Sequence, residues 1–164
     1  TPETALGEAS NGPLPIPYTA EEVGRTFVGL LATFDFAVEM RELGIKRLQF
    51  VKRLRAKKLM TAVCFALWHL ALERSVPHYA DAFFANFTAT YPPMVGERRG
   101  AKKLRGLVVQ YDSLMAEKKD TDFTRVADTL VNALHIEESD KRRQQLKLSL
   151  HIRSVYELIF NKLI

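Results

Sequence analysis

The segment from residue 45 to residue 72 constrains the fold of this chain more than any other. Its first part, residues 45–58, carries seven basic side chains and no acidic one. Its second part, residues 59–72, is almost entirely apolar, and no glycine or proline separates the two parts. A helix that is apolar on all sides is normally buried among other elements. We therefore expect one continuous helix, residues 45–73, that begins as a cationic helix and ends inside a helical core.

Five further helices are predicted around it. Thr19-Ala-Glu-Glu22 forms a capping box, and the apolar residues that follow keep helical spacing until Gly44 supplies a left-handed stop. A third helix is opened by Ser75-Val-Pro77 and ended by Pro92-Pro93. Apolar stripes predict two more helices, at about 97–117 and 122–136.

The last segment, residues 140–164, is ambiguous at its start. Residues 146–152 alternate between apolar and polar as a strand would, but the sequence offers no partner strand, and a lone strand cannot satisfy its backbone. We interpret the segment as a sixth helix. The prediction is an all-α, single-domain bundle of about six helices over residues 19–164, preceded by an extended proline-rich N-terminal arm, residues 1–18.

The length and the cysteine content set further limits. A chain of 164 residues can form one domain with a sizeable core. The single cysteine, Cys64, lies in the apolar run, so we expect a buried thiol and no disulfide framework. The chain has no early apolar run, and residues 59–72 are too few to span a bilayer. We therefore expect no transmembrane segment and a cytoplasmic location.

The charges are unevenly distributed along the chain. Residues 1–44 carry seven acidic and two basic side chains, whereas residues 45–74 carry eight basic and one acidic, and residues 98–105 add five basic ones. Either the acidic first helix neutralises the basic second helix, or the cations form a binding surface. The candidate binding residues are Lys46, Arg47, Lys52, Arg53, Arg55, Lys57, Lys58, Arg98, Arg99, Lys102, Lys103 and Arg105.

No motif in the sequence points to catalysis. The histidines have no Glu-x-x-His or His-Glu-x-x-His context, and residues 96–103 lack the glycine spacing of a phosphate loop. His69 and Glu73 share a helix face, which we interpret as an interior histidine beside a helix-end carboxylate. Asp35, Glu39 and Glu42 are interpreted as a solvated or salt-bridged stripe. We predict no catalytic residue, metal or cofactor.

The sequence favours a non-catalytic helical interaction module that binds a protein partner or self-associates. The alternative is a nucleic-acid-binding protein that uses residues 46–58 together with 98–105 and 141–147. A second alternative is an enzyme or small-ligand binder whose pocket cannot be read from the sequence. Convergence of the three basic segments on one face would favour nucleic acid or another polyanion as the partner.

Overall fold

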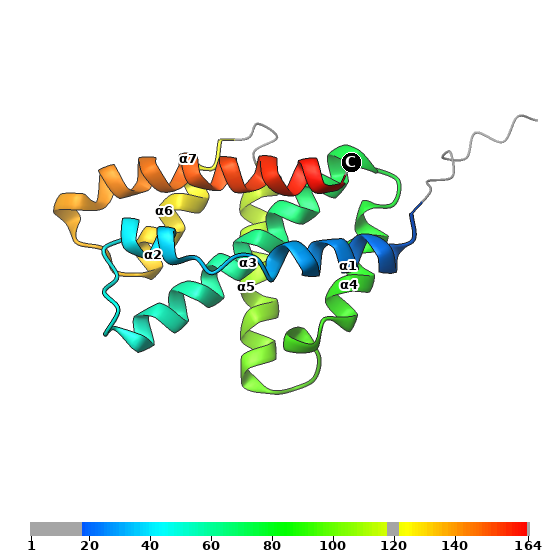
Figure 1. Ribbon diagram of the computed structural model, residues 1–164, viewed down its shortest axis with the longest axis horizontal. Coiled ribbons are helices and arrows are strands. Elements are labelled where there is room, and N and C mark those ends of the chain that lie inside the picture. The colour runs from blue at the N-terminus through cyan, green and yellow to red at the C-terminus, as the bar shows by residue number, and fades with distance from the viewer. Residues whose placement is uncertain (1–17, 118–121, 164) are drawn as a thin grey trace, which may run out of the picture.

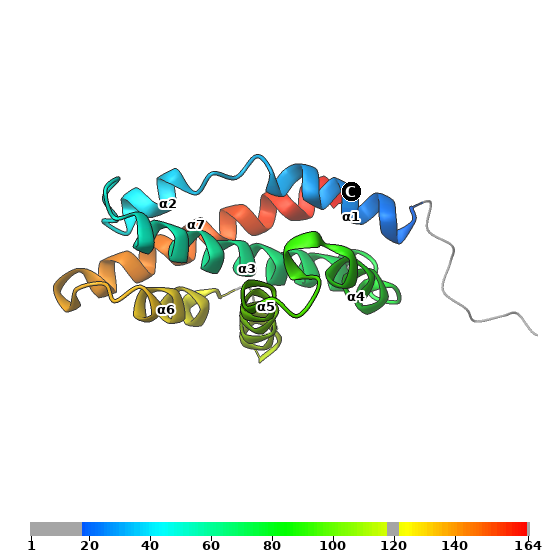
Figure 2. The same cartoon turned by 90° about the horizontal axis from the view of Figure 1, so that it is seen from below.

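The computed structural model describes residues 18–117 and 122–163, and these residues form helices without any strand. Figure 1 and Figure 2 show the arrangement from two sides. The elements are α1 (Ala20–Leu31), α2 (Ala37–Glu42), α3 (Phe50–Ser75), α4 (Ala80–Thr90), the 3-10 turn η1 (Pro92–Met94), α5 (Arg99–Glu117), α6 (Thr124–Ala133) and α7 (Glu138–Leu163). The all-α prediction is confirmed. The predicted arm lies outside the described residues except for Tyr18.

Helix α3 is the central element of the bundle. It packs against α1, α4, α5 and α7, and its buried residues begin at Ala56 and continue to Leu72. Trp68 stacks on Phe27 of α1 with ring centroids 4.6 Å apart, and Phe87 of α4 meets the same Trp68 edge-on at 4.9 Å. The apolar run predicted to be the core is therefore the core, because neighbouring helices cover it on several sides.

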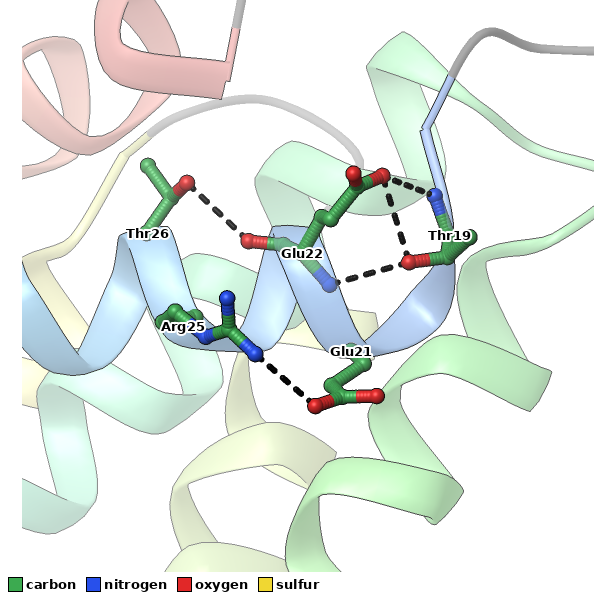
Figure 3. A network of polar contacts seen from close by, with 5 residues as sticks. All are labelled: Thr19, Glu21, Glu22, Arg25 and Thr26. Atoms are coloured by element: carbon green, nitrogen blue, oxygen red, sulfur yellow. Dashed lines mark hydrogen bonds and ion pairs between the residues drawn. The ribbon is translucent and has the colours of Figure 1, made fainter.

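The start of α1 is fixed by the predicted capping box, shown in Figure 3. The Thr19 hydroxyl accepts a hydrogen bond from the Glu22 backbone N–H at 3.2 Å, and the Glu22 carboxylate accepts one from the Thr19 N–H at 2.8 Å. Arg25 pairs with Glu21 one turn earlier at 2.8 Å. The two hydrogen bonds between Thr19 and Glu22 satisfy backbone donors that the first turn of a helix otherwise leaves free.

The predicted first helix is wrong in its extent, because the chain breaks it into α1 and α2. Phe36 has a left-handed backbone with φ of 57° and is buried, and the Asp35 carboxylate accepts a hydrogen bond from the Ala37 N–H at 3.0 Å. Burial of the Phe36 ring can stabilise a conformation that a non-glycine residue rarely adopts. Gly44, with φ of 72°, follows α2 as expected.

Other boundaries also shift. Residues 45–49 form a turn in which the Gln49 side chain accepts a hydrogen bond from the Lys46 N–H at 2.9 Å, so α3 begins at Phe50 instead of residue 45. Ser75 is the last residue of α3 and does not open α4, which begins at Ala80. The last segment is helical, as predicted. None of the described helices has the length and apolarity needed to cross a membrane.

Candidate interaction surface

The first turns of α3 extend beyond the core, beside the N-terminal half of α5. In Figure 1 the N-terminal ends of both helices lie at the lower side of the molecule. The two helices make extensive contact further along. Because burial in α3 begins only at Ala56, the turns before it expose both apolar and basic side chains to solvent.

Large apolar side chains are exposed at this end of α3. Leu48, Phe50, Val51 and Leu54 are 83%, 68%, 82% and 62% exposed. At 3.6 residues per turn, Val51 and Leu54 lie on the side of α3 opposite to the buried Ala56. Sequence reasoning missed these residues as a possible site. Their positions do not continue the helical spacing of the buried apolar residues, and this could have identified them as exposed.

A groove of about 520 Å³ lies between α3 and the N-terminal half of α5. Its apolar lining includes Leu54, Tyr91 and Leu104. Three cations also line it: Lys57 and Lys58 from α3, and Arg98 from the residue before α5. The groove therefore combines an apolar lining with positive charge.

A second groove, of about 480 Å³, lies between α3, α5 and α6. Val51, Leu59 and Leu107 contribute apolar surface, and the cations are Arg55, Lys58 and Lys103. Leu54 and Lys58 line both grooves, so they form a ridge between them. We call this region the α3–α5 surface, and it consists of Val51, Leu54, Arg55, Lys57, Lys58, Arg98 and Lys103 with the two grooves.

The cations of α3 on this surface are not neutralised within the described part of the chain. Arg55, Lys57 and Lys58 are exposed, and no hydrogen bond or ion pair joins their side chains to another described residue. Arg55 still acts electrostatically on buried Tyr111 of α5. Burial raises the pKa of Tyr111 to about 12, and the charge of Arg55 partly opposes that rise.

Two acidic residues that precede the basic helix, Glu39 and Glu42, pair with α7. Glu39 accepts a hydrogen bond from Nε2 of His151 on α7 at 2.6 Å, and Glu42 pairs with Lys147 on α7 at 3.1 Å. The sequence left open whether the acidic first helix neutralises the basic second helix. Glu39 and Glu42 do not do so, because both pair with α7. Lys147, from the third basic segment, is itself neutralised.

Only two of the three basic segments come together, and those only in part. The start of α7, which holds the segment 141–147, lies far from the start of α5 (Figure 1). Within the second segment, Arg105 is structural, since its guanidinium donates to the carbonyls of Met94 and Gly96 at 2.7 Å each. Lys102 pairs with Glu97 at 2.8 Å.

The remaining predicted residues lie around the α3–α5 surface without lining its two grooves. Lys46 and Arg47 are exposed in the turn before α3, and Arg99 is exposed at the start of α5. Lys52 and Arg53 are partly buried on the side of α3 that faces the body. The sequence thus listed the cations of the surface, but it did not distinguish those that line the grooves from those that lie around them.

The helix ends add to the positive potential of this surface. The N-terminus of a helix carries a partial positive charge, which acidic residues in the first turn usually offset. The first turns of α3 and α5 contain no acidic residue. Cations at these helix ends favour an anionic contact from outside.

Comparison with known proteins offers no relative from which a function could be transferred. No protein-family model matches the chain, and no curated protein or solved structure is significantly similar to it. Among the described residues, neither groove of the α3–α5 surface is lined by a histidine, cysteine, aspartate or glutamate. The lining therefore offers apolar contact surface and positive charge.

Proposed function

We propose that this protein is a non-catalytic helical interaction module whose α3–α5 surface binds an acidic, amphipathic helical segment of a partner protein. The observation that carries the proposal is the exposed apolar surface of Leu54, which lies between the two grooves, and of Val51 in the second groove, beside cations of α3 that form no ion pair with another described residue. Partner helices that dock into grooves present apolar anchors at positions i, i+3, i+4 and i+7. Acidic residues beside those anchors would meet Arg55, Lys57 and Lys58.

The apolar part of the surface favours protein over nucleic acid as the partner. Phosphate contacts need cationic reach alone and gain little from Leu54 or Val51. Binding of single strands relies on several aromatic side chains that stack on bases. Phe50 is the aromatic residue exposed at the start of α3, and Tyr91 in the first groove is only partly exposed.

The charge of the surface favours a different protein over a second copy of this one. A twofold symmetric dimer places the same patch on both sides of the interface, so Arg55, Lys57 and Lys58 would face their own copies. Like charges brought together in this way oppose association. An acidic segment has the opposite effect, because its charge complements the surface and accelerates encounter.

A synthetic acidic amphipathic peptide provides the test. The probe is an 18-residue, dye-labelled peptide with leucine at i, i+3, i+4 and i+7, glutamate beside the leucines and alanine, a strong helix former, at the remaining positions, and fluorescence anisotropy measures its binding. We expect binding at least tenfold tighter than that of a scrambled peptide of equal composition. The Val51→Ser/Leu54→Ser variant should reduce this affinity at least tenfold, while Val109→Ser, on exposed α5 surface outside the linings of both grooves, should not.

Other partners would give a different pattern. Equal binding of the scrambled peptide would mean that charge alone is recognised, which contradicts the proposal. Tighter binding of a DNA or RNA duplex, or of vesicles containing phosphatidylserine, would replace the proposed partner with that polyanion. A concentration-dependent dimer in sedimentation velocity that Leu54→Ser disrupts would assign the surface to self-association.

A further inference from the structure

A second polar cluster lies in the C-terminal half of α3, away from the α3–α5 surface. His69 of α3 is surrounded by carboxylates from three helices. Its Nδ1 lies 2.8 Å from Oδ1 of Asp112 on α5, and its Nε2 lies 3.0 Å from Oδ1 of Asp81 on α4. Oε1 of Glu73, one turn further along α3, is 3.7 Å from the same Nε2. The Phe84 ring stacks on the imidazole at 4.1 Å and fixes its plane.

The cluster has more negative than positive charge. Among the described residues, His69 is the only basic side chain that forms an ion pair with Glu73, Asp81 or Asp112. Even a protonated imidazole neutralises only one of the three carboxylates, so the cluster still has a charge of −2.

The two nitrogens of His69 have different surroundings. Asp112 is partly buried and faces Nδ1, whereas Glu73 and Asp81 both face Nε2. Histidines that bind metals usually donate their second ring N–H to a carboxylate, which fixes the tautomer and the ring orientation. Asp112 is placed for that role at Nδ1, and Nε2, which lies 3.0 Å from Asp81, would release its proton to solvent when a metal binds.

We propose that Nε2 of His69 and one carboxylate oxygen each of Glu73 and Asp81 bind a divalent first-row transition metal of the zinc type, with Asp112 as the residue that orients His69. The three donor atoms lie within 4.8 Å of one another. Ligand atoms about 2.1 Å from one tetrahedral zinc are about 3.4 Å apart. The distances from Nε2 to Asp81 and Glu73, 3.0 and 3.7 Å, lie on either side of that value.

The donors combine a protected nitrogen with reachable oxygens. The side chain of His69 is 11% exposed, that of Glu73 is 48% exposed and that of Asp81 is 92% exposed. A metal can therefore enter from solvent, and water can complete its coordination. One imidazole with two carboxylates suits zinc or its neighbours better than magnesium, which prefers oxygen ligands alone. This inference is independent of the partner proposed for the α3–α5 surface.

Calorimetric titration of the chelator-treated protein with zinc sulfate tests the site. We expect one zinc ion per chain, with at least tenfold weaker binding in Asp81→Asn and in Glu73→Gln, whose exposed side chains can be replaced without loss of the fold. Asp112→Asn should weaken zinc binding about 10- to 100-fold, as loss of an orienting partner does. The matched control is His78→Gln, an exposed histidine three residues before Asp81, and it should bind zinc as the unaltered chain does.

Circular dichroism in chelator confirms that each variant is folded before titration. Nitrogen chemical shifts should show zinc on Nε2 of His69. Failure of the unaltered chain to bind zinc would overturn the proposal and leave His69 as an ion-pair partner of three carboxylates. Zinc binding that persists in the Glu73→Gln/Asp81→Asn double variant, or that disappears in His78→Gln, would also overturn it, because the metal would then occupy another site.

Discussion

Replacing Glu39 by glutamine should lower the free energy of unfolding at pH 5.5 and should lower it much less at pH 8.5. Glu39 joins α2 to α7 through Nε2 of His151, at 2.6 Å. The Glu39 side chain is 10% exposed and that of His151 is 34% exposed. Glutamine preserves the size of the side chain and can still accept the hydrogen bond, so the substitution removes mainly the negative charge.

The magnitude follows from the burial of the pair. A hydrogen bond to a charged group contributes about 1.5–3 kcal/mol. Since a third of His151 faces water, solvent screens part of that energy, and we expect a loss of about 1–2 kcal/mol. Glu42 also favours the protonated imidazole, and it is itself paired with Lys147. A residual pH dependence therefore remains in the variant.

The pH window follows from the two pKa shifts. The hydrogen bond that His151 donates to Glu39 raises the pKa of His151 against the effect of burial, so the contribution of His151 is full below pH 6.5 and is lost as the pH rises through the raised value. Burial alone would raise the pKa of Glu39, but the His151 hydrogen bond gives a net lowering despite the charge of Asp35. Its contribution is present above pH 4.5 and is lost as the pH falls through the lowered value. The pair is therefore strongest near pH 5.5.

Urea unfolding followed by circular dichroism at pH 5.5 and 8.5 measures this effect. The proteins are the unaltered chain, Glu39→Gln, His151→Gln and the double variant, which complete a double-mutant cycle. We expect a coupling energy of about 1–2 kcal/mol at pH 5.5 and a clearly smaller one at pH 8.5. A coupling energy near zero at pH 5.5, or one equal at both pH values, would refute the pairing.

Three further predictions concern packing and loop structure. A Cβ on Gly24 would lie 2.8 Å from the ring of Phe87, so Gly24→Ala should destabilise the fold by about 1–3 kcal/mol through overpacking, which the higher helix propensity of alanine offsets in part. Gly29 has open space around it, so Gly29→Ala should stabilise the fold by about 0.5–1 kcal/mol in the same urea assay. Cys64 is buried and burial raises the pKa of its thiol, so a thiol reagent should label it only after unfolding; rapid labelling of the native protein would contradict this. Arg105→Ala should lower the free energy of unfolding by about 1–3 kcal/mol, because two backbone carbonyls before α5 lose their charged donor, and unchanged stability would contradict that role.

The sequence predicted those parts of the fold that follow from local pattern. The capping box at Thr19, the apolar run around Trp68 and the helical spacing of the last segment each have a short-range physical cause, and the structure contains all three. The break at Phe36 could not be predicted in this way. Its left-handed backbone accompanies a buried ring, and contacts between distant elements do not appear in helical periodicity.

The candidate site was predicted in its charge and missed in its geometry. The cations of α3 could be listed from the sequence, but local pattern does not reveal that Glu39 and Glu42 pair with α7, more than a hundred residues away. The cluster around His69 shows the same limit. The i, i+4 spacing revealed Glu73, whereas Asp81 and Asp112 join it only because α4 and α5 pack beside α3.

The most direct test of the interaction surface is the Arg55→Glu/Lys57→Glu/Lys58→Glu variant. A control with the same change in charge, Arg142→Glu/Arg143→Glu/Lys162→Glu, alters exposed cations on α7. Because the three α3 cations form no ion pair with a described residue, the α3 variant should keep its helical signal and a free energy of unfolding within about 0.5 kcal/mol.

Anisotropy titration with the acidic amphipathic peptide then compares the three proteins. We expect the α3 variant to bind the peptide about tenfold more weakly than the unaltered chain. The α7 control should bind the peptide at least threefold more tightly than the α3 variant does. Unfolding of the α3 variant would show that these cations are structural ion-pair partners. Equal loss of peptide binding in both variants would show that net charge alone attracts the peptide, and either result would contradict a binding site at the α3–α5 surface.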